Sequence, residues 1–177
     1  MPDRTPRGYS LYELIGTIAI ASLVLSLGIP SFGRVVAEHR LKVDVDALFH
    51  AIHLARKESV MRRREVTLCP SANGRDCLPV SDWSTGWIMF VNLDRDSPAH
   101  RDTGEAVLKQ HAAGLHNLIQ ANRRSFSFRT TQYRATNGTF TLCDKAGRAP
   151  ARRLIVSYTG RPRVRLAEAR TCPVMSN

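Results

Sequence analysis

An uncharged apolar run from Leu14 to Ile29, with one carboxylate directly before it, restricts the possible folds of this chain more than any other feature. The carboxylate belongs to Glu13, and a charged group at the centre of a bilayer costs roughly 2.5–3.5 kcal/mol on insertion scales. With the residues from Tyr9 onward, the run reaches about the ~20 residues that a spanning helix needs. We therefore expect an N-terminal membrane helix in which Glu13 has a function.

Two other interpretations of these residues are weaker. A cleaved secretory signal would have its small-residue site at Ala19-Ile20-Ala21, but few apolar residues precede that site and more apolar sequence follows it. An ordinary signal anchor would leave the position of Glu13 without a reason. Cleavage before the apolar run is the better interpretation.

The heptapeptide GYSLYEL, which begins at Gly8, resembles the prepilin signature of type IV pilins and type II secretion pseudopilins. In that family a prepilin peptidase cuts after the glycine, so the resemblance implies a leader peptide 1–8 and N-methylation of the new first residue, Tyr9. It also implies an assembly role for Glu13, which would neutralise an ammonium near the positive end of the helix dipole. Pro30 matches the family's helix-bending proline.

Residues 9–34 are then the transmembrane and assembly helix, and residues 35–64 show the periodicity of an amphipathic helix. Its stripe recurs at alternating steps of four and three: Leu41, Val45, Leu48, Ile52, Ala55 and Ser59. Charged residues are predicted on the other faces: Arg40, Lys42, Asp44, Asp46, Arg56 and Lys57. We expect Pro30 to kink or locally open the helix, and the helix to end near Arg62–Arg64.

From Glu65 onward the pattern changes to short β-like runs: EVTLCP, GWIMFVN, AVLKQH, NLIQA, SFSFR, TFTLCD, RRLIVSY and RPRVRL. Asn137-Gly138 and Thr159-Gly160 suit hairpin turns. The predicted fold class is α+β. A long N-terminal helix, transmembrane and then amphipathic, packs against a C-terminal antiparallel β-sheet domain formed by the periplasmic residues 65–177.

The four cysteines form no C-x-x-C pair, and no histidine lies at zinc-ligand spacing from them. An even count behind a membrane-targeting N-terminus indicates two disulfides in an oxidising compartment. Three pairings are possible. We favour Cys69–Cys77, across the turn-rich PSANGRD, and Cys143–Cys172, which ties back the C-terminal tail.

The formal net charge of +11 is unevenly distributed along the chain. Residues 1–122 carry 14 basic and 13 acidic groups, whereas residues 123–177 carry 12 basic and two acidic groups. Most of the basic residues are arginines, whose planar fork suits phosphate better than a lysine ammonium does. The C-terminal third therefore predicts an anionic partner.

Within that third, the four residues beginning at Gly160 read G-R-P-R and follow the predicted strand LIVSY. Gly160 allows a turn, and residues two apart in an extended segment share a face, so Arg161, Arg163 and Arg165 would project together. Their spacing would let them follow successive phosphates of one nucleic-acid strand. Three more arginines would widen the patch: Arg148, Arg152 and Arg153. The alternative is a solvated edge that guards an exposed strand against aggregation.

Four stretches, ARKESVMRRREVTLCPS, DWSTGWIMFVN, GTFTLCD and RRLIVSYTGRPRVR, resemble the GspH/FimT subgroup of minor pilins and pseudopilins. In FimT-like minor pilins the G-R-x-R motif implies binding of transforming DNA. The resemblance therefore implies a minor type IV pilin that binds double-stranded DNA, largely without regard to sequence, for natural transformation. Its other partners would be neighbouring pilins through the N-terminal helix, the prepilin peptidase and the inner membrane. It would cross that membrane once, with a periplasmic domain, before assembly into a surface pilus.

The alternative from the same family is a type II secretion pseudopilin with a structural role and no DNA binding, because the same leader serves both. An enzyme is disfavoured, since the sequence has no P-loop, no H-E-x-x-H, no nucleophile elbow and no dinucleotide fingerprint; no cofactor is expected. Residues 92–96 alternate oxygen ligands but lack the glycine and the final glutamate of a calcium loop. We expect a polar loop there, and no metal site.

Overall fold

A computed structural model of the chain describes residues 10–112, 114–130, 134–167 and 172, except the side chains of residues 27–31. The chain divides into two compact units, residues 1–36 and 37–177. One helix, α1 (Leu11–Arg62), contributes residues to both units. The second unit holds the described strands and, with them, the arginine-rich segment singled out in the sequence.

Helix α1 begins after Ser10 and is assigned as helical without interruption to Arg62, which matches the predicted end. Of the two effects predicted for Pro30, a kink or a local opening, the opening is not found, because the helix assignment continues through residue 30. A proline removes one amide donor, but the turns on either side of it keep their own hydrogen bonds, so the helix can continue.

In the part of the chain that the structure describes, no helix is both long enough and apolar enough to cross a membrane.

The apolar stripe predicted for residues 35–64 is confirmed, because each of its six members is at most 2% exposed. Asp44, predicted on a solvent face, is instead buried. Its Oδ2 accepts a hydrogen bond from Asn117 Nδ2 at 2.6 Å, and its Oδ1 lies 3.5 Å from His111 Nε2. This carboxylate therefore ties α1 to the strands through polar contacts that the periodicity does not reveal.

Eight strands occur among the described residues, each within two residues of a predicted run at either end. The first sheet has the order β3-β2-β1-β5 and is antiparallel throughout: β1 (Glu65–Pro70), β2 (Gly86–Asn92), β3 (Val107–Ala112) and β5 (Phe126–Phe128). The second has the order β4-β6-β7-β8 and is also antiparallel: β4 (Asn117–Ala121), β6 (Gly138–Asp144), β7 (Arg152–Val156) and β8 (Pro162–Leu166). The predicted α+β fold class, with an antiparallel β domain, is confirmed, and the strands of that domain form two sheets.

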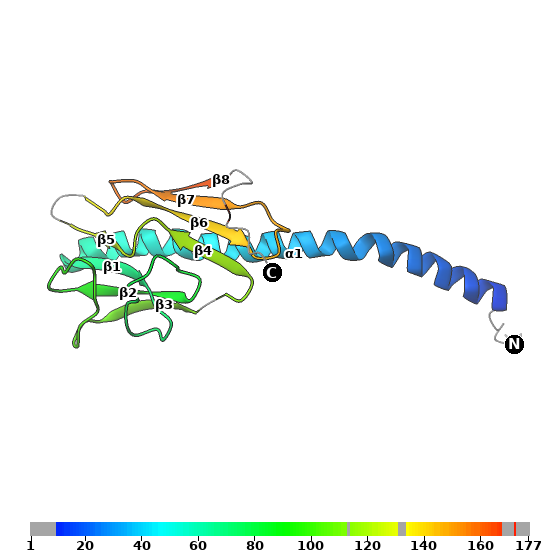
Figure 1. The fold of residues 1–177 in the computed structure, drawn as a ribbon, viewed down its shortest axis with the longest axis horizontal. Coiled ribbons are helices and arrows are strands. Elements are labelled where there is room, and N and C mark those ends of the chain that lie inside the picture. Colours follow the sequence, from blue (N-terminus) through cyan, green and yellow to red (C-terminus); the bar gives the residue numbers. More distant parts are fainter. Residues whose placement is uncertain (1–9, 113, 131–133, 168–171, 173–177) are drawn as a thin grey trace, which may run out of the picture. The chain divides into compact units, whose positions relative to one another are not determined.

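The main hydrophobic core joins the second half of α1 to both sheets. Figure 1 draws β6–β8 above this part of the helix and β1–β3 below it. The core's largest side chains are aromatic and at most 1% exposed: Trp83, Trp87, Phe126, Phe128 and Phe140. Neither sheet could stay folded alone with such a surface exposed, so helix and sheets form one cooperative unit.

The hairpin turn predicted at Asn137-Gly138 was wrong. Gly138 is the first residue of β6, and β5 and β6 lie in different sheets. A Cβ at this position would lie 2.6 Å from Asn122 Oδ1 and 2.8 Å from Phe126 Cε1. The glycine is therefore required by close approach of neighbouring side chains and not by a turn.

Both favoured disulfides are present. Cys69–Cys77 joins β1 to the loop that follows it, and Cys143–Cys172 joins β6 to the tail beyond β8. Cys69 belongs to a small apolar cluster with Ile88 and Phe90, against which Cys77 packs. The loop that carries Cys77 therefore helps to cover the face of the first sheet that points away from the main core.

Candidate nucleic-acid interface

The turn between β7 and β8 is closed by backbone hydrogen bonds and depends on Gly160. Gly160 N donates to Ser157 O at 2.8 Å, and Ser157 N donates to Arg161 O at 3.1 Å. Gly160 has φ +72°, and a Cβ there would lie 3.2 Å from both Ala135 Cβ and the Phe128 ring. The predicted hairpin turn is confirmed, and its buried glycine lets the turn pack directly against the end of β5.

The strand register places Arg163 of the motif, and Arg165 two residues after it, on the outer face of the second sheet. Arg163 lies opposite Ile155, and Arg165 lies opposite Arg153. Leu154, the neighbour of both β7 residues, is fully buried in the core. Since side chains alternate between the faces of a strand, Arg163 and Arg165 point away from the core, and both are exposed.

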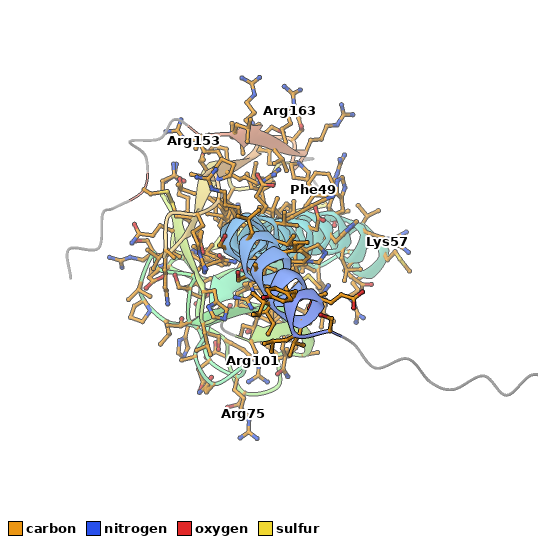
Figure 2. The ribbon with its side chains drawn as sticks, turned by 90° about the vertical axis from the view of Figure 1, so that its right-hand side faces the viewer. Phe49, Lys57, Arg75, Arg101, Arg153 and Arg163 are labelled. Carbon is orange, nitrogen blue, oxygen red and sulfur yellow. A yellow bond between two sulfur atoms is a disulfide. The ribbon has the colours of Figure 1, made fainter. Side chains whose placement is uncertain are left out.

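Arg161 directly precedes β8 and is also exposed. Its amide donates to Ser157 Oγ at 3.1 Å, which leaves the guanidinium outside the turn's own hydrogen bonds. Figure 2 shows Arg163 projecting from the ribbon at the top of the view, with Arg153 nearby. Arg163 and Arg165 are about 6.6 Å apart along the strand.

The three arginines expected to widen the patch, Arg148, Arg152 and Arg153, lie in three different environments. Arg153 is half-buried on the same outer face as Arg165. Arg152 lies on the opposite face of β7, and its Nε is buried without a hydrogen bond within the described part of the chain. Adjacent residues in a strand point to opposite faces, so Arg152 does not extend the outer row.

Arg148 is exposed in the turn between β6 and β7. Its amide donates to Asp144 Oδ2 at 2.8 Å, and its Nε lies 3.9 Å from the same oxygen. The nearby carboxylate partly offsets its charge. Arg148 therefore contributes less positive potential than Arg163 or Arg165.

A hollow of about 420 Å³ lies on the outer face beside these arginines. Its lining comes from β4, β6 and β7 and includes Gln120, Thr139, Thr141, Arg153 and Ile155. Among the described residues, none that lines it is a carboxylate. Amide, hydroxyl and guanidinium groups beside an arginine row offer hydrogen-bond donors to an anionic backbone.

The segment that contains β7 and β8 carries positive charge only. Residues 145–167 contain six arginines and one lysine, with no Asp or Glu. Because Arg163 and Arg165 are exposed, water already solvates them, and they can meet phosphates without the cost of burial. The arrangement suits a polyanion.

The N-terminal residues assigned to processing and assembly are described only in part. Gly8 and Tyr9 lie outside the described residues, as does the side chain of Pro30. Glu13 is exposed in the first turn of α1, where its Oε2 accepts a hydrogen bond from Ser10 N at 3.4 Å. The pattern S-x-x-E is a capping box, a signal of the helix start that the sequence already carries.

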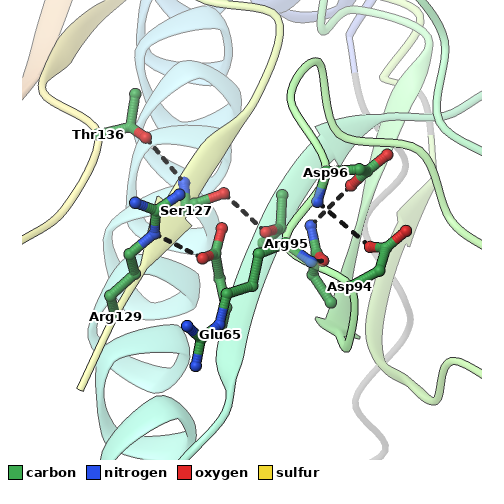
Figure 3. A network of polar contacts seen from close by, with 9 residues as sticks. Glu65, Asp94, Arg95, Asp96, Ser127, Arg129 and Thr136 are labelled. Atoms are coloured by element: carbon green, nitrogen blue, oxygen red, sulfur yellow. Dashed lines mark hydrogen bonds and ion pairs between the residues drawn. The ribbon is translucent and has the colours of Figure 1, made fainter. Parts of the chain in front are cut away.

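The loop that contains Asn92–Asp96 uses its oxygens within the chain. The two carboxylate oxygens of Asp96 accept from Asn92 Nδ2 at 2.9 Å and from His100 N at 2.6 Å. Figure 3 shows this loop beside the ion pair between Glu65 and Arg129. Among the described residues no group of three or more His, Cys, Asp or Glu is placed to hold a metal ion. The loop is a polar connection held by its own hydrogen bonds.

A long helix packs on antiparallel sheets, and two disulfides cross-link the domain. This combination is typical of a pilin-like protein. The chain belongs to the family described as Type II transport protein GspH, whose model matches residues 44–160. The resemblance to the GspH/FimT subgroup is thereby confirmed. No curated protein matches the chain.

Among solved structures, the chain is similar to the type IV minor pilin FimU of Pseudomonas aeruginosa. One crystal form aligns with TM-score 0.52 and 21% identity over 76% of this chain and 93% of that chain. A second form aligns with TM-score 0.49 and 21% identity over 75% and 96% of the two chains. The first comparison shows that this chain has the fold of that minor pilin.

Proposed function

We propose that this chain is a minor type IV pilin that binds double-stranded DNA through the β7–β8 hairpin and serves DNA uptake in natural transformation. The observation that carries the proposal is the row of exposed arginines on the outer face of β8. Guanidinium groups on a strand, beside a hollow whose described lining includes amide and hydroxyl groups, suit phosphate contacts that do not depend on base sequence. The G-R-x-R motif of FimT-like pilins supports the same function.

The proposal includes the life cycle of the family. The prepilin peptidase removes residues 1–8, Tyr9 is methylated, and residues 9–34 hold the protein in the inner membrane with its domain in the periplasm. The helix then packs among those of other pilins when the protein enters a surface pilus. Support comes from family membership and from the leader motif at Gly8.

The test is a binding titration of the full-length protein in detergent with fluorescent duplexes of unrelated sequence. We expect similar affinities for all duplexes at about 50 mM salt, where phosphate contacts are strong. Arg161→Ala/Arg163→Ala should weaken every duplex alike. Arg75→Ala is the matched control, because Arg75 and Arg163 lie at opposite ends of the view in Figure 2.

The second candidate is a type II secretion pseudopilin, which the name of the matching family favours. Such a protein would have a structural role and no need of a DNA-binding face. If the wild type fails to bind duplexes, or if the double arginine variant binds as well as the wild type, this candidate becomes the better account. Association with secretion pseudopilins in pull-downs would then be expected.

A further inference from the structure

A narrow recess lies where α1, the end of β5 and the β7–β8 turn meet. Its lining includes Arg56 from α1, Arg129 from the residue after β5, and Thr159 from the turn. We call it the end recess. Its free volume of about 20 Å³ has room for about one water molecule, so an anion would sit at its mouth.

Among the described residues that line the end recess, the charged ones are all arginines: Arg56, Arg129 and Arg134. Arg129 is partly neutralised, because its Nε lies 2.6 Å from Glu65 Oε2. Within the described residues, the side chains of Arg56 and Arg134 have no carboxylate partner. Guanidinium groups that share one recess without a counter-ion repel each other, and an anion at the mouth would relieve that repulsion.

Residues that line the end recess contact the β7–β8 hairpin directly. The Arg134 guanidinium lies 5.4 Å from the centre of the Tyr158 ring, which belongs to the β7–β8 turn. Ala135 N donates to Tyr158 O at 2.9 Å, and Arg129 N donates to Arg134 O at 3.1 Å. These contacts hold the segment of Arg134 against the turn that carries Arg161.

We propose that the end recess is a second phosphate-binding site for the same duplex that the hairpin binds. The inference rests on the proposed function and extends it. Arg134 contacts the ring of Tyr158 in the turn that also carries Arg161, and Arg56 lines the end recess together with Arg134. A duplex lying along the hairpin meets additional phosphate contacts there, which makes the footprint larger than the G-R-x-R motif alone predicts.

The helix dipole does not account for Arg56 or Arg134. Cations stabilise the negative end of a helix, but the effect falls off within the last turn. Arg56 lies six residues before the end of α1, more than one turn away. Arg134 is not on a helix at all. The helix dipole therefore gives neither residue a sufficient reason to face the recess.

The experiment measures the slope of log K against log salt for full-length protein in detergent and a duplex. Arg134→Gln and Arg56→Gln should each lower the slope by about 0.9, the value for one phosphate contact. Arg134→Lys should keep the wild-type slope. Arg75→Gln removes the same charge from another part of the surface and should leave the slope unchanged. Melting curves of each variant check that the fold is intact, and Arg56→Gln carries the test should Arg134→Gln unfold.

The outcomes separate this inference from the function on which it rests. If Arg163→Gln lowers the slope while Arg134→Gln and Arg56→Gln behave like Arg75→Gln, the end recess binds no phosphate and the hairpin function stands. If the wild type does not bind DNA, both fail. A lower slope for the recess variants with unchanged melting temperature supports the second site.

Discussion

The glycine and the arginines of the β7–β8 turn differ in burial and therefore in role. Gly160 is buried against Phe128 and Ala135 and adopts a positive φ, so it positions the turn. Arg161 and Arg163 are exposed and carry the charge. A motif assigned to binding as a whole thus combines a packing residue with two residues that are available to a ligand.

Gly160→Ala should destabilise the protein more than Gly147→Ala does. Both glycines have positive φ, which costs an L-residue about 1–2 kcal/mol. Only at Gly160 does the added Cβ also meet neighbours, 3.2 Å away, whereas at Gly147 nothing lies within 4 Å. Urea unfolding of both variants measures the difference. Equal losses would show that packing of the turn against β5 contributes nothing.

The ion pair between Glu65 and Arg129 should contribute measurably to the stability of the fold. The Glu65 side chain is 1% exposed and pairs with Arg129 at 2.6 Å. Arg129→Ala leaves a buried carboxylate unpaired and should cost about 3 kcal/mol, the lower end for a broken buried pair because Arg129 is itself half-exposed. Adding Glu65→Gln should recover part of the loss. Denaturant midpoints that are additive across the two changes would contradict this coupling.

At the scale of elements, local patterns were sufficient to locate α1's buried stripe and every described strand. The arrangement of strands was not predictable in the same way, because pairing is non-local. Thr67 of β1 pairs with Ser127 of β5, and no period in the sequence joins them. The hairpin predicted at Asn137-Gly138 was wrong for the same reason. The two residues suit a turn, but β6 pairs with β4 and β7 and not with β5. The outward orientation of Arg163 was predictable from the alternation of side chains between the two faces of a strand. The end recess was not predictable from the sequence, because three separate elements form it.

The two disulfides should differ in their contribution to stability. Cys143–Cys172 closes a separation of 29 residues, and Cys69–Cys77 closes one of 8. On the chain-entropy estimate, their removal costs about 3.6 and 2.6 kcal/mol respectively. Replacing each pair with Ala and comparing thermal unfolding tests this order. A larger loss from the Cys69–Cys77 variant would mean that covering the first sheet's outer cluster outweighs loop closure.

At the scale of the whole molecule, one helix serves both compact units. Its second half is committed to the core of residues 37–177 through side chains such as Leu48 and Ile52. The first half exposes large apolar side chains such as Leu23 and Leu25. Exposed apolar surface of this extent is typical of a binding surface, and under the proposed function the helices of other pilins cover it.

Glu13→Gln should enter pili poorly while leaving the folded domain unchanged. The carboxylate lies in the first turn of α1, close to the site where the proposed cleavage creates an ammonium. Glutamine keeps the size of the side chain and removes its charge, so pairing with an ammonium is lost. Immunoblots of sheared pili and of membranes report incorporation and insertion separately. Normal incorporation of the variant would show that the charge has no role in assembly.

The salt dependence of duplex binding, compared between the wild type and Arg161→Ala/Arg163→Ala, tests most directly whether the β7–β8 hairpin binds DNA. Each phosphate contact contributes about 0.9 to the slope of log K against log salt, so the double variant should lose about 1.8, equally for unrelated sequences. Its melting temperature should stay unchanged, because both side chains are exposed. Equal slopes for the two proteins, or no binding by the wild type near 50 mM salt, would contradict a DNA-binding hairpin.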